Sequence, residues 1–182
     1  VFERPVVAQL RRQAVIESIK RKAVDDKSLR EYWERLPAED RHEPRVAATA
    51  AQSFIALGSC RDAHRIVEEG LERQWDSSLL AIYSECLDTD VRQQLERAEM
   101  WLQQHPRDAV LLLTLGRLCA HQGLWGKARS YLEASLSIEP THSAYLQLGR
   151  LLEREGKPAE AAAEYQKALT VTLEQLKQHG GG

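Results

Sequence analysis

The amino-acid sequence predicts an all-α protein, an α-solenoid in which helical hairpins stack into a right-handed superhelix. Three observations predict this fold class. Aromatic residues make up only 6% of the 182 residues, and Ala, Leu, Glu, Arg and Gln fill the segments between helix breakers. The β-branched residues form no alternating runs, so the sequence indicates no strands. Small residues also recur at a fixed spacing, which indicates an internal repeat.

Proline, glycine and aspartate divide the chain into segments of about 10 to 16 residues, the usual length of a helix in a globular protein. Pro37, Gly58, Pro106 and Gly123 are examples of these breakers. We expect about ten helices, at residues 5–22, 27–36, 44–57, 60–74, 77–87, 90–104, 109–121, 125–138, 142–155 and 158–177.

The spacing of small residues identifies the repeat. Three pairs lie 33 positions apart: Gly116 and Gly149, Gly123 and Gly156, and Ala128 and Ala161. This pattern matches the tetratricopeptide repeat (TPR), a helix–turn–helix unit. Gly or Ala lets the two antiparallel helices of a unit touch, and larger apolar residues fill the gap to the next unit.

The template divides the chain into an N-terminal part and four units. Residues 43–75 form a TPR-like repeat, 76–108 a degenerate repeat with about three residues missing, and 109–141 a regular repeat. Residues 142–178 form a further repeat with the C-terminal helix. Residues 1–40 fit the template poorly and form a helical pair, either a divergent repeat or a cap.

Composition excludes several classes of function. The formal net charge is −2, so no basic excess predicts nucleic-acid binding. The longest apolar run, 109–113, is far shorter than the roughly 20 residues that cross a bilayer. The three cysteines, Cys60, Cys86 and Cys119, cannot all pair within one chain, which argues against a disulfide scaffold and favours a reducing compartment. No nucleophile, phosphate-loop or metalloprotease motif occurs, so we expect no enzyme activity.

The stretches 115–119 and 122–136 resemble the C-terminal half of HemY proteins, as do Trp33–Pro37, Leu71–Asp76 and Leu95–Leu102. The most specific part is Trp125-Gly126-Lys127-Ala128, because ordinary repeats seldom place Trp-Gly there. HemY is a bacterial TPR family associated with late haem synthesis. The resemblance implies a protein held in the inner membrane by N-terminal helices, which this chain does not contain, with its repeats on the cytoplasmic side.

The resemblance also implies an accessory role beside protoporphyrinogen oxidase and ferrochelatase. The predicted function is a non-catalytic scaffold of late haem biosynthesis that organises these enzymes through its concave groove. Two alternatives stay open: a carrier of porphyrin or haem, and a generic TPR adaptor without a pathway link.

The first helices of successive units are expected to line the concave groove. The residues predicted to face a partner there are Leu113, Arg117, His121, Leu146, Gln147, Arg150 and Arg154. Arg117 and Arg150 are equivalent positions one period apart. They are a candidate pair of guanidinium groups for carboxylates, either in an acidic segment of a partner or in porphyrin propionates. The alternative is two solvated arginines paired with glutamates such as Glu153.

No resident cofactor or metal is predicted. His121 lies two residues from Cys119, yet Cys119 occupies a template position that is normally buried, and four convergent zinc ligands cannot be assembled. Binding of haem or protoporphyrin stays open only as the carrier alternative. The four tryptophans are expected to fill joints between units, and a tryptophan exposed beside the groove would be a candidate for protein contact.

Overall fold

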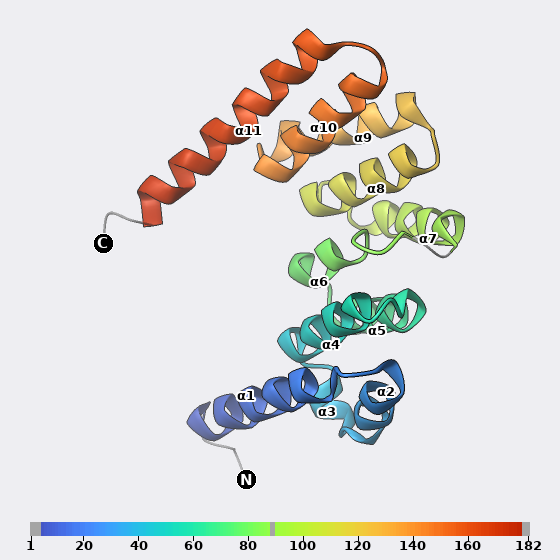
Figure 1. The fold of residues 1–182 in the computed structure, drawn as a ribbon, viewed down its shortest axis with the longest axis vertical. Helices are drawn as coiled ribbons and strands as arrows, with labels where there is room; N and C mark the ends of the chain where they lie inside the picture. Colours follow the sequence, from blue (N-terminus) through green and yellow to red (C-terminus); the bar gives the residue numbers. More distant parts are fainter. Residues whose placement is uncertain (1–4, 88–89, 180–182) are drawn as a thin grey trace. The chain divides into compact units, whose positions relative to one another are not determined.

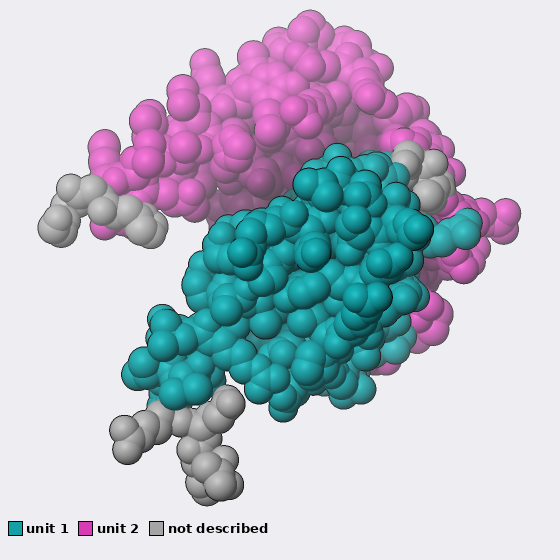
Figure 2. All heavy atoms as spheres, turned by 60° about the horizontal axis from the view of Figure 1, so that its bottom comes forward, with its two compact units in different colours: residues 1–89 teal, residues 90–182 magenta. Residues whose placement is uncertain are grey.

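The computed structural model describes residues 5–87 and 90–179, and every regular element in these ranges is a helix. The chain divides into two compact units, residues 1–89 and 90–182, which are distinguished by colour in Figure 2. The division falls inside the predicted degenerate repeat 76–108. Each unit is described by itself.

Unit 1 begins with a long helix, α1, and continues through a helical hairpin made by α4 and α5 (Figure 1). Its helices are α1 (Pro5–Lys22), α2 (Asp26–Arg35), α3 (Ala38–Arg41), α4 (Pro44–Ala56), α5 (Cys60–Arg73) and α6 (Ser77–Ile82). Helix α1 packs on α2 and α4, and α6 packs on α4 and α5. The core contains Ile19, Leu29, Phe54 and Leu80, all fully buried.

Unit 2 is a series of antiparallel helices in which sequence neighbours pack on one another (Figure 1). Its helices are α7 (Val91–Gln104), α8 (Ala109–His121), α9 (Trp125–Ile138), α10 (His142–Arg154) and α11 (Pro158–His179). The pairs α8/α9 and α10/α11 form the most extensive helical hairpins, and α10 also packs on α8 and α9.

Three glycines make the turns of the hairpins. Gly58, Gly123 and Gly156 have φ angles of 76°, 73° and 75°, in the left-handed region that glycine adopts without steric cost. In the α8/α9 turn, the Leu124 amide then donates to the Cys119 carbonyl at 2.9 Å. The equivalent bond, from the amide of residue 157 to the carbonyl of residue 152, closes the α10/α11 turn. The 33-residue sequence period therefore corresponds to a period in backbone structure.

Gly116 and Gly149, one period apart, let the two helices of each hairpin touch. A Cβ atom on Gly116 would lie 2.7 Å from Cδ2 of Leu132, and one on Gly149 would lie 2.6 Å from Cδ1 of Tyr165. Real Cβ atoms do not approach other atoms so closely. The absence of a side chain therefore sets the distance between α8 and α9 and between α10 and α11.

Side-chain caps begin several of the helices. The carboxylates of Asp25, Asp76, Asp90 and Asp108 each accept a hydrogen bond from the backbone amide three residues later, and the Thr141 hydroxyl does the same. Such caps satisfy amides that have no partner within the helix and stabilise it by about 1 kcal/mol. These residues explain why the helix starts could be predicted to within a residue.

The predicted helix 77–87 is wrong in its second half, because α6 ends at Ile82. Tyr83 is fully buried and its hydroxyl donates to Glu68 at 2.6 Å, while His64 Nε2 lies 3.0 Å from the Cys86 carbonyl oxygen. The segment 83–87 thus bonds to α5 instead of continuing the helix. The short helix α3 was not predicted either; its four residues carry no apolar period.

The cysteine count argued against a disulfide scaffold, and the structure contains a single disulfide among the described residues. Cys60, at the start of α5, and Cys86 form a disulfide, with Cα atoms 5.7 Å apart. This separation is the ordinary one for a disulfide. The bond attaches the segment 83–87 to α5, and Cys119 is the free, buried cysteine. Counting cysteines showed that all three could not pair, but not that two of them do.

Candidate partner-binding site

The residues predicted to face a partner lie on two helices of unit 2. Helix α8 carries Leu113, Arg117 and His121, and α10 carries Leu146, Gln147, Arg150 and Arg154. On α8, Leu113, Arg117 and His121 lie four positions apart, and on α10 the same spacing separates Leu146, Arg150 and Arg154. Each set of three therefore forms a stripe along one face of its helix. Gln147, which follows Leu146, widens the stripe on α10. We call these two stripes together the α8–α10 face.

The two stripes have the same orientation within their hairpins. Gly116 faces Leu132 of α9 and Gly149 faces Tyr165 of α11, and the next residues, Arg117 and Arg150, follow one step around each helix. Because α8 and α10 pack on each other, corresponding stripes lie on neighbouring helices of the same unit. The structure therefore places equivalent residues of the two repeats at equivalent positions on neighbouring helices.

The residues of the α8–α10 face differ in burial. Leu113, Arg117, Leu146 and Gln147 are half-buried, whereas His121, Arg150 and Arg154 are exposed. Half-buried leucines beside exposed cations form a mixed surface with apolar area and charge. Surfaces of this kind suit a peptide segment better than a reaction that requires an enclosed chamber.

Among the described residues, no carboxylate pairs with the arginines of α10. Neither Arg150 nor Arg154 forms an ion pair with a carboxylate in residues 5–87 or 90–178. Glu153, the predicted alternative partner, instead acts on Tyr165: burial of the phenol and then its hydrogen bond with Glu153 raise the Tyr165 pKa, which Arg150 opposes. The charge on Arg150 thus stays available to a carboxylate from outside.

Arg154 differs from the other residues of the face because it contacts an aromatic ring. Its guanidinium carbon lies 5.6 Å from the ring centroid of Trp125, within cation–π range. Trp33 and Trp101 are buried as expected, but Trp125 is 37% exposed, so the expectation that every tryptophan fills a joint is wrong for Trp125. Trp125 is the first residue of α9 and lies partly exposed at the corner between α8 and α9.

Cys119 and His121 do not form a metal site. Cys119 is fully buried, and burial raises the pKa of its thiol to about 11, while His121 is exposed at the end of α8. A thiol with so high a pKa is a poor metal ligand at neutral pH. Among the residues that the structure describes, no three His, Cys, Asp or Glu side chains converge to hold a metal ion.

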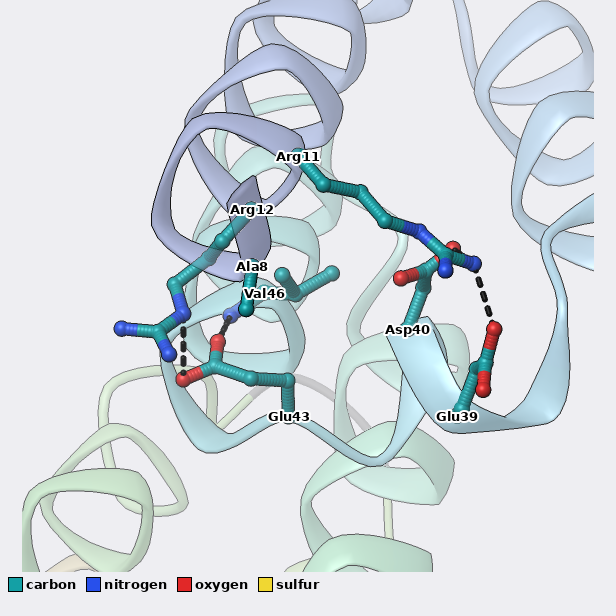
Figure 3. A pocket seen from close by; sticks show the side chains of 7 residues that line it. All are labelled: Ala8, Arg11, Arg12, Glu39, Asp40, Glu43 and Val46. Atoms are coloured by element: carbon teal, nitrogen blue, oxygen red, sulfur yellow. Dashed lines mark hydrogen bonds and ion pairs between the residues drawn. The ribbon is translucent and has the colours of Figure 1, made fainter. Parts of the chain in front are cut away.

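A pocket of about 180 Å³ in unit 1 lies beside α1, α3 and α4 (Figure 3). Each of its charged side chains has an oppositely charged partner. Arg11 bonds to Glu39 at 2.5 Å and to Asp40 at 2.9 Å, and Arg12 lies 3.1 Å from Glu43. Glu43 also accepts from the Val46 amide and so caps α4. These pairs attach α1 to the rest of unit 1, and we assign the pocket a structural role.

The hairpins, their glycine turns and the close helix contacts define the class: the chain is a TPR protein. The tetratricopeptide repeat family model matches residues 142–175. A thermophilic TPR protein in Thermus thermophilus has a similar fold, with a TM-score of 0.66 and 21% identity over 91% of this chain and 94% of that one. The crystal structure of MamA gives a TM-score of 0.59 and 15% identity over 97% and 99% of the two chains. At these identities the similarity concerns the fold alone.

Sequence relatives narrow the likeness within this class. The chain is 31% identical over 170 residues to protein HemY of Escherichia coli K12 and, at the same identity, to protein HemY of Shigella flexneri. The alignment covers 92% of this chain, so the chain is similar to HemY proteins over nearly its whole length. The chain spans 42% of the length of these relatives. The resemblance seen in the Trp125–Ala128 stretch is thus confirmed.

No helix among the described residues combines the length and the apolar character needed to cross a membrane.

Proposed function

We propose that this chain is a non-catalytic scaffold of late haem biosynthesis that binds pathway enzymes through the α8–α10 face. The TPR class supports a non-catalytic scaffold, because TPR solenoids are typically interaction modules without catalysis of their own. The similarity to HemY proteins supports the link to haem biosynthesis. The enzymes proposed as partners are protoporphyrinogen oxidase and ferrochelatase, held near one another so that a reactive intermediate travels a short distance.

The observation that carries the binding site is the exposed guanidinium of Arg150, which has no carboxylate partner among the described residues and lies on a face with half-buried leucines; Arg117 is the equivalent residue one period earlier. A guanidinium binds a carboxylate through two parallel hydrogen bonds, which gives direction as well as affinity. An acidic segment of an enzyme that lies along α8 and α10 would meet both arginines. Its apolar side chains would cover Leu113 and Leu146.

We further propose that the intact protein is attached to the bacterial inner membrane, with the repeats on the cytoplasmic side. Attachment there would hold the α8–α10 face beside membrane-bound enzymes and raise their effective concentration.

The test is affinity capture of the two purified enzymes by the immobilised chain. We expect at least one enzyme to bind, and Arg117→Gln combined with Arg150→Gln to weaken binding about tenfold, which corresponds to about 1.4 kcal/mol. The matched control is Arg92→Gln, an arginine of α7 whose side chain is 83% exposed and paired with Glu96. Absence of capture would refute the pathway role, and capture equal to wild type in the double variant would refute the arginine site.

A further inference from the structure

The corner between α8 and α9 exposes apolar surface that the fold does not use. Leu124 is 44% exposed and Trp125 is 37% exposed, side by side at the start of α9. Arg154, the last residue of α10, lies over the Trp125 ring. Leu124, Trp125 and Arg154 therefore form one small surface, the Trp125 corner, built from two neighbouring hairpins of unit 2.

The cations around this corner divide into paired and unpaired ones. On α9, Lys127 is paired with Glu99 and Arg129 with Glu155. Arg154 has no carboxylate partner among the described residues, and Glu155, its neighbour in sequence, is already bound by Arg129. The positive charge over Trp125 is thus left for an external anion.

The two helices of the α8–α10 face, of which α10 supplies Arg154 to the corner, are basic, although the chain as a whole is acidic. Helices α8 and α10 together contain three arginines and one glutamate, a net charge of +2 with histidine neutral, against −2 for the whole chain. Helix α8 has no acidic residue. The charge of this part of unit 2 therefore complements an acidic partner.

We infer that the Trp125 corner anchors a partner segment in which an acidic residue stands next to a large apolar one. The carboxylate binds Arg154, and the apolar side chain packs on Trp125 and Leu124. Tryptophan and arginine are enriched among the few residues that dominate the binding energy of protein interfaces. A guanidinium already placed on an indole ring loses little side-chain entropy on binding. This inference rests on the proposed function in taking the partner to be a protein, and it adds the chemistry of the segment.

The test uses the whole chain and needs no known partner. Short random peptides displayed on phage are selected on the immobilised protein, and enriched peptides are synthesised and titrated by fluorescence anisotropy. We expect enriched peptides to contain Asp or Glu beside Leu, Phe or Trp. Trp125→Ala should weaken their binding about tenfold, and Arg154→Glu should transfer the preference to peptides with Lys in place of the acid.

Two variants on α7 serve as matched controls: Met100→Ala removes an apolar side chain that is 62% exposed, and Arg92→Gln removes an exposed charge. Both should bind like wild type. Circular dichroism verifies that each variant is folded; if Trp125→Ala is not, the charge reversal at Arg154 decides.

Three results would overturn the inference: no enriched peptide, enriched peptides without acidic residues, or equal affinity in wild type and in the folded variants at Trp125 and Arg154. The outcome is separate from that of the proposed function. Peptides that bind the corner while neither enzyme is captured would preserve the corner and refute the pathway role. Captured enzymes without peptides that depend on the corner would preserve the pathway role and refute the corner.

Discussion

Gly149 shows at the scale of one residue how the hairpins are held. A Cβ atom there would overlap the Tyr165 ring, whereas a Cβ on Gly126 would meet nothing within 4 Å. We predict that Gly149→Ala lowers the free energy of unfolding by about 1–3 kcal/mol, because an aromatic ring must move. Gly126→Ala should raise it by about 0.5 kcal/mol, since alanine favours the helix. Urea titrations of both variants give the values. Equal effects at the two positions would contradict the packing described for α10 and α11.

Cys119 provides a pH-dependent prediction. Burial raises the pKa of its thiol to about 11 in the folded protein, whereas the same thiol in the unfolded chain ionises with its ordinary pKa of 9.0. The folded state therefore keeps the proton up to a higher pH than the unfolded chain. The resulting stabilisation of the folded state, about 2 kcal/mol, is complete below pH 9 and lost between pH 9 and 11. Urea titrations across this range should show a steep decline in wild type and a shallower one in Cys119→Ala. Parallel declines would mean that Cys119 does not contribute.

Single residues also show where the sequence was sufficient for the site and where it was not. The helical period placed Leu113, Arg117, Leu146 and Arg150 on their helices, because a 33-residue repeat maps each residue onto its equivalent. The contact between Arg154 and Trp125 joins two hairpins, and no spacing within one repeat encodes it. The Trp125-Gly126 pair, which ordinary repeats seldom have, was the one signal in the sequence that this corner differs from other repeats.

At the scale of elements, the segment 83–87 is the place where the repeat departs from its template. The Cys60–Cys86 disulfide closes a loop with a sequence separation of 26 residues, and His64 bonds to the Cys86 carbonyl. We predict that reduction, or Cys60→Ser with Cys86→Ser, lowers the free energy of unfolding of the oxidised protein by about 3 kcal/mol. Urea titrations with and without a phosphine reductant measure this. The reductant should not affect the double variant, and an unchanged wild-type midpoint would show that the disulfide does not constrain the chain.

Helix boundaries could be predicted where a local signal sets them. The starts of α8 and α10 follow the caps Asp108 and Thr141, and α8 and α9 have the predicted bounds 109–121 and 125–138. The end of α6 could not be predicted, because it depends on Glu68, His64 and Cys60, which are distant in sequence from residues 83–87. Tertiary contacts there override the helix propensity of the segment.

At the scale of the whole molecule, repeated hairpins supply the α8–α10 face that we propose binds partners. The 33-residue period predicted the TPR class, and the similarity to HemY proteins was predicted from the same stretch of sequence. The partners stay a proposal, since the chain spans 42% of its relatives and a surface of leucines and arginines defines a chemistry, not a single protein.

A scaffold must hold two partners at the same time, and this requirement gives the most direct measurement. Mass photometry of the chain mixed with protoporphyrinogen oxidase and ferrochelatase should show a particle whose mass is that of all three proteins together. Arg117→Gln with Arg150→Gln should deplete that particle, whereas Arg92→Gln should leave it unchanged. If each enzyme displaces the other, or if neither adds to the mass of the chain, the scaffold account is contradicted.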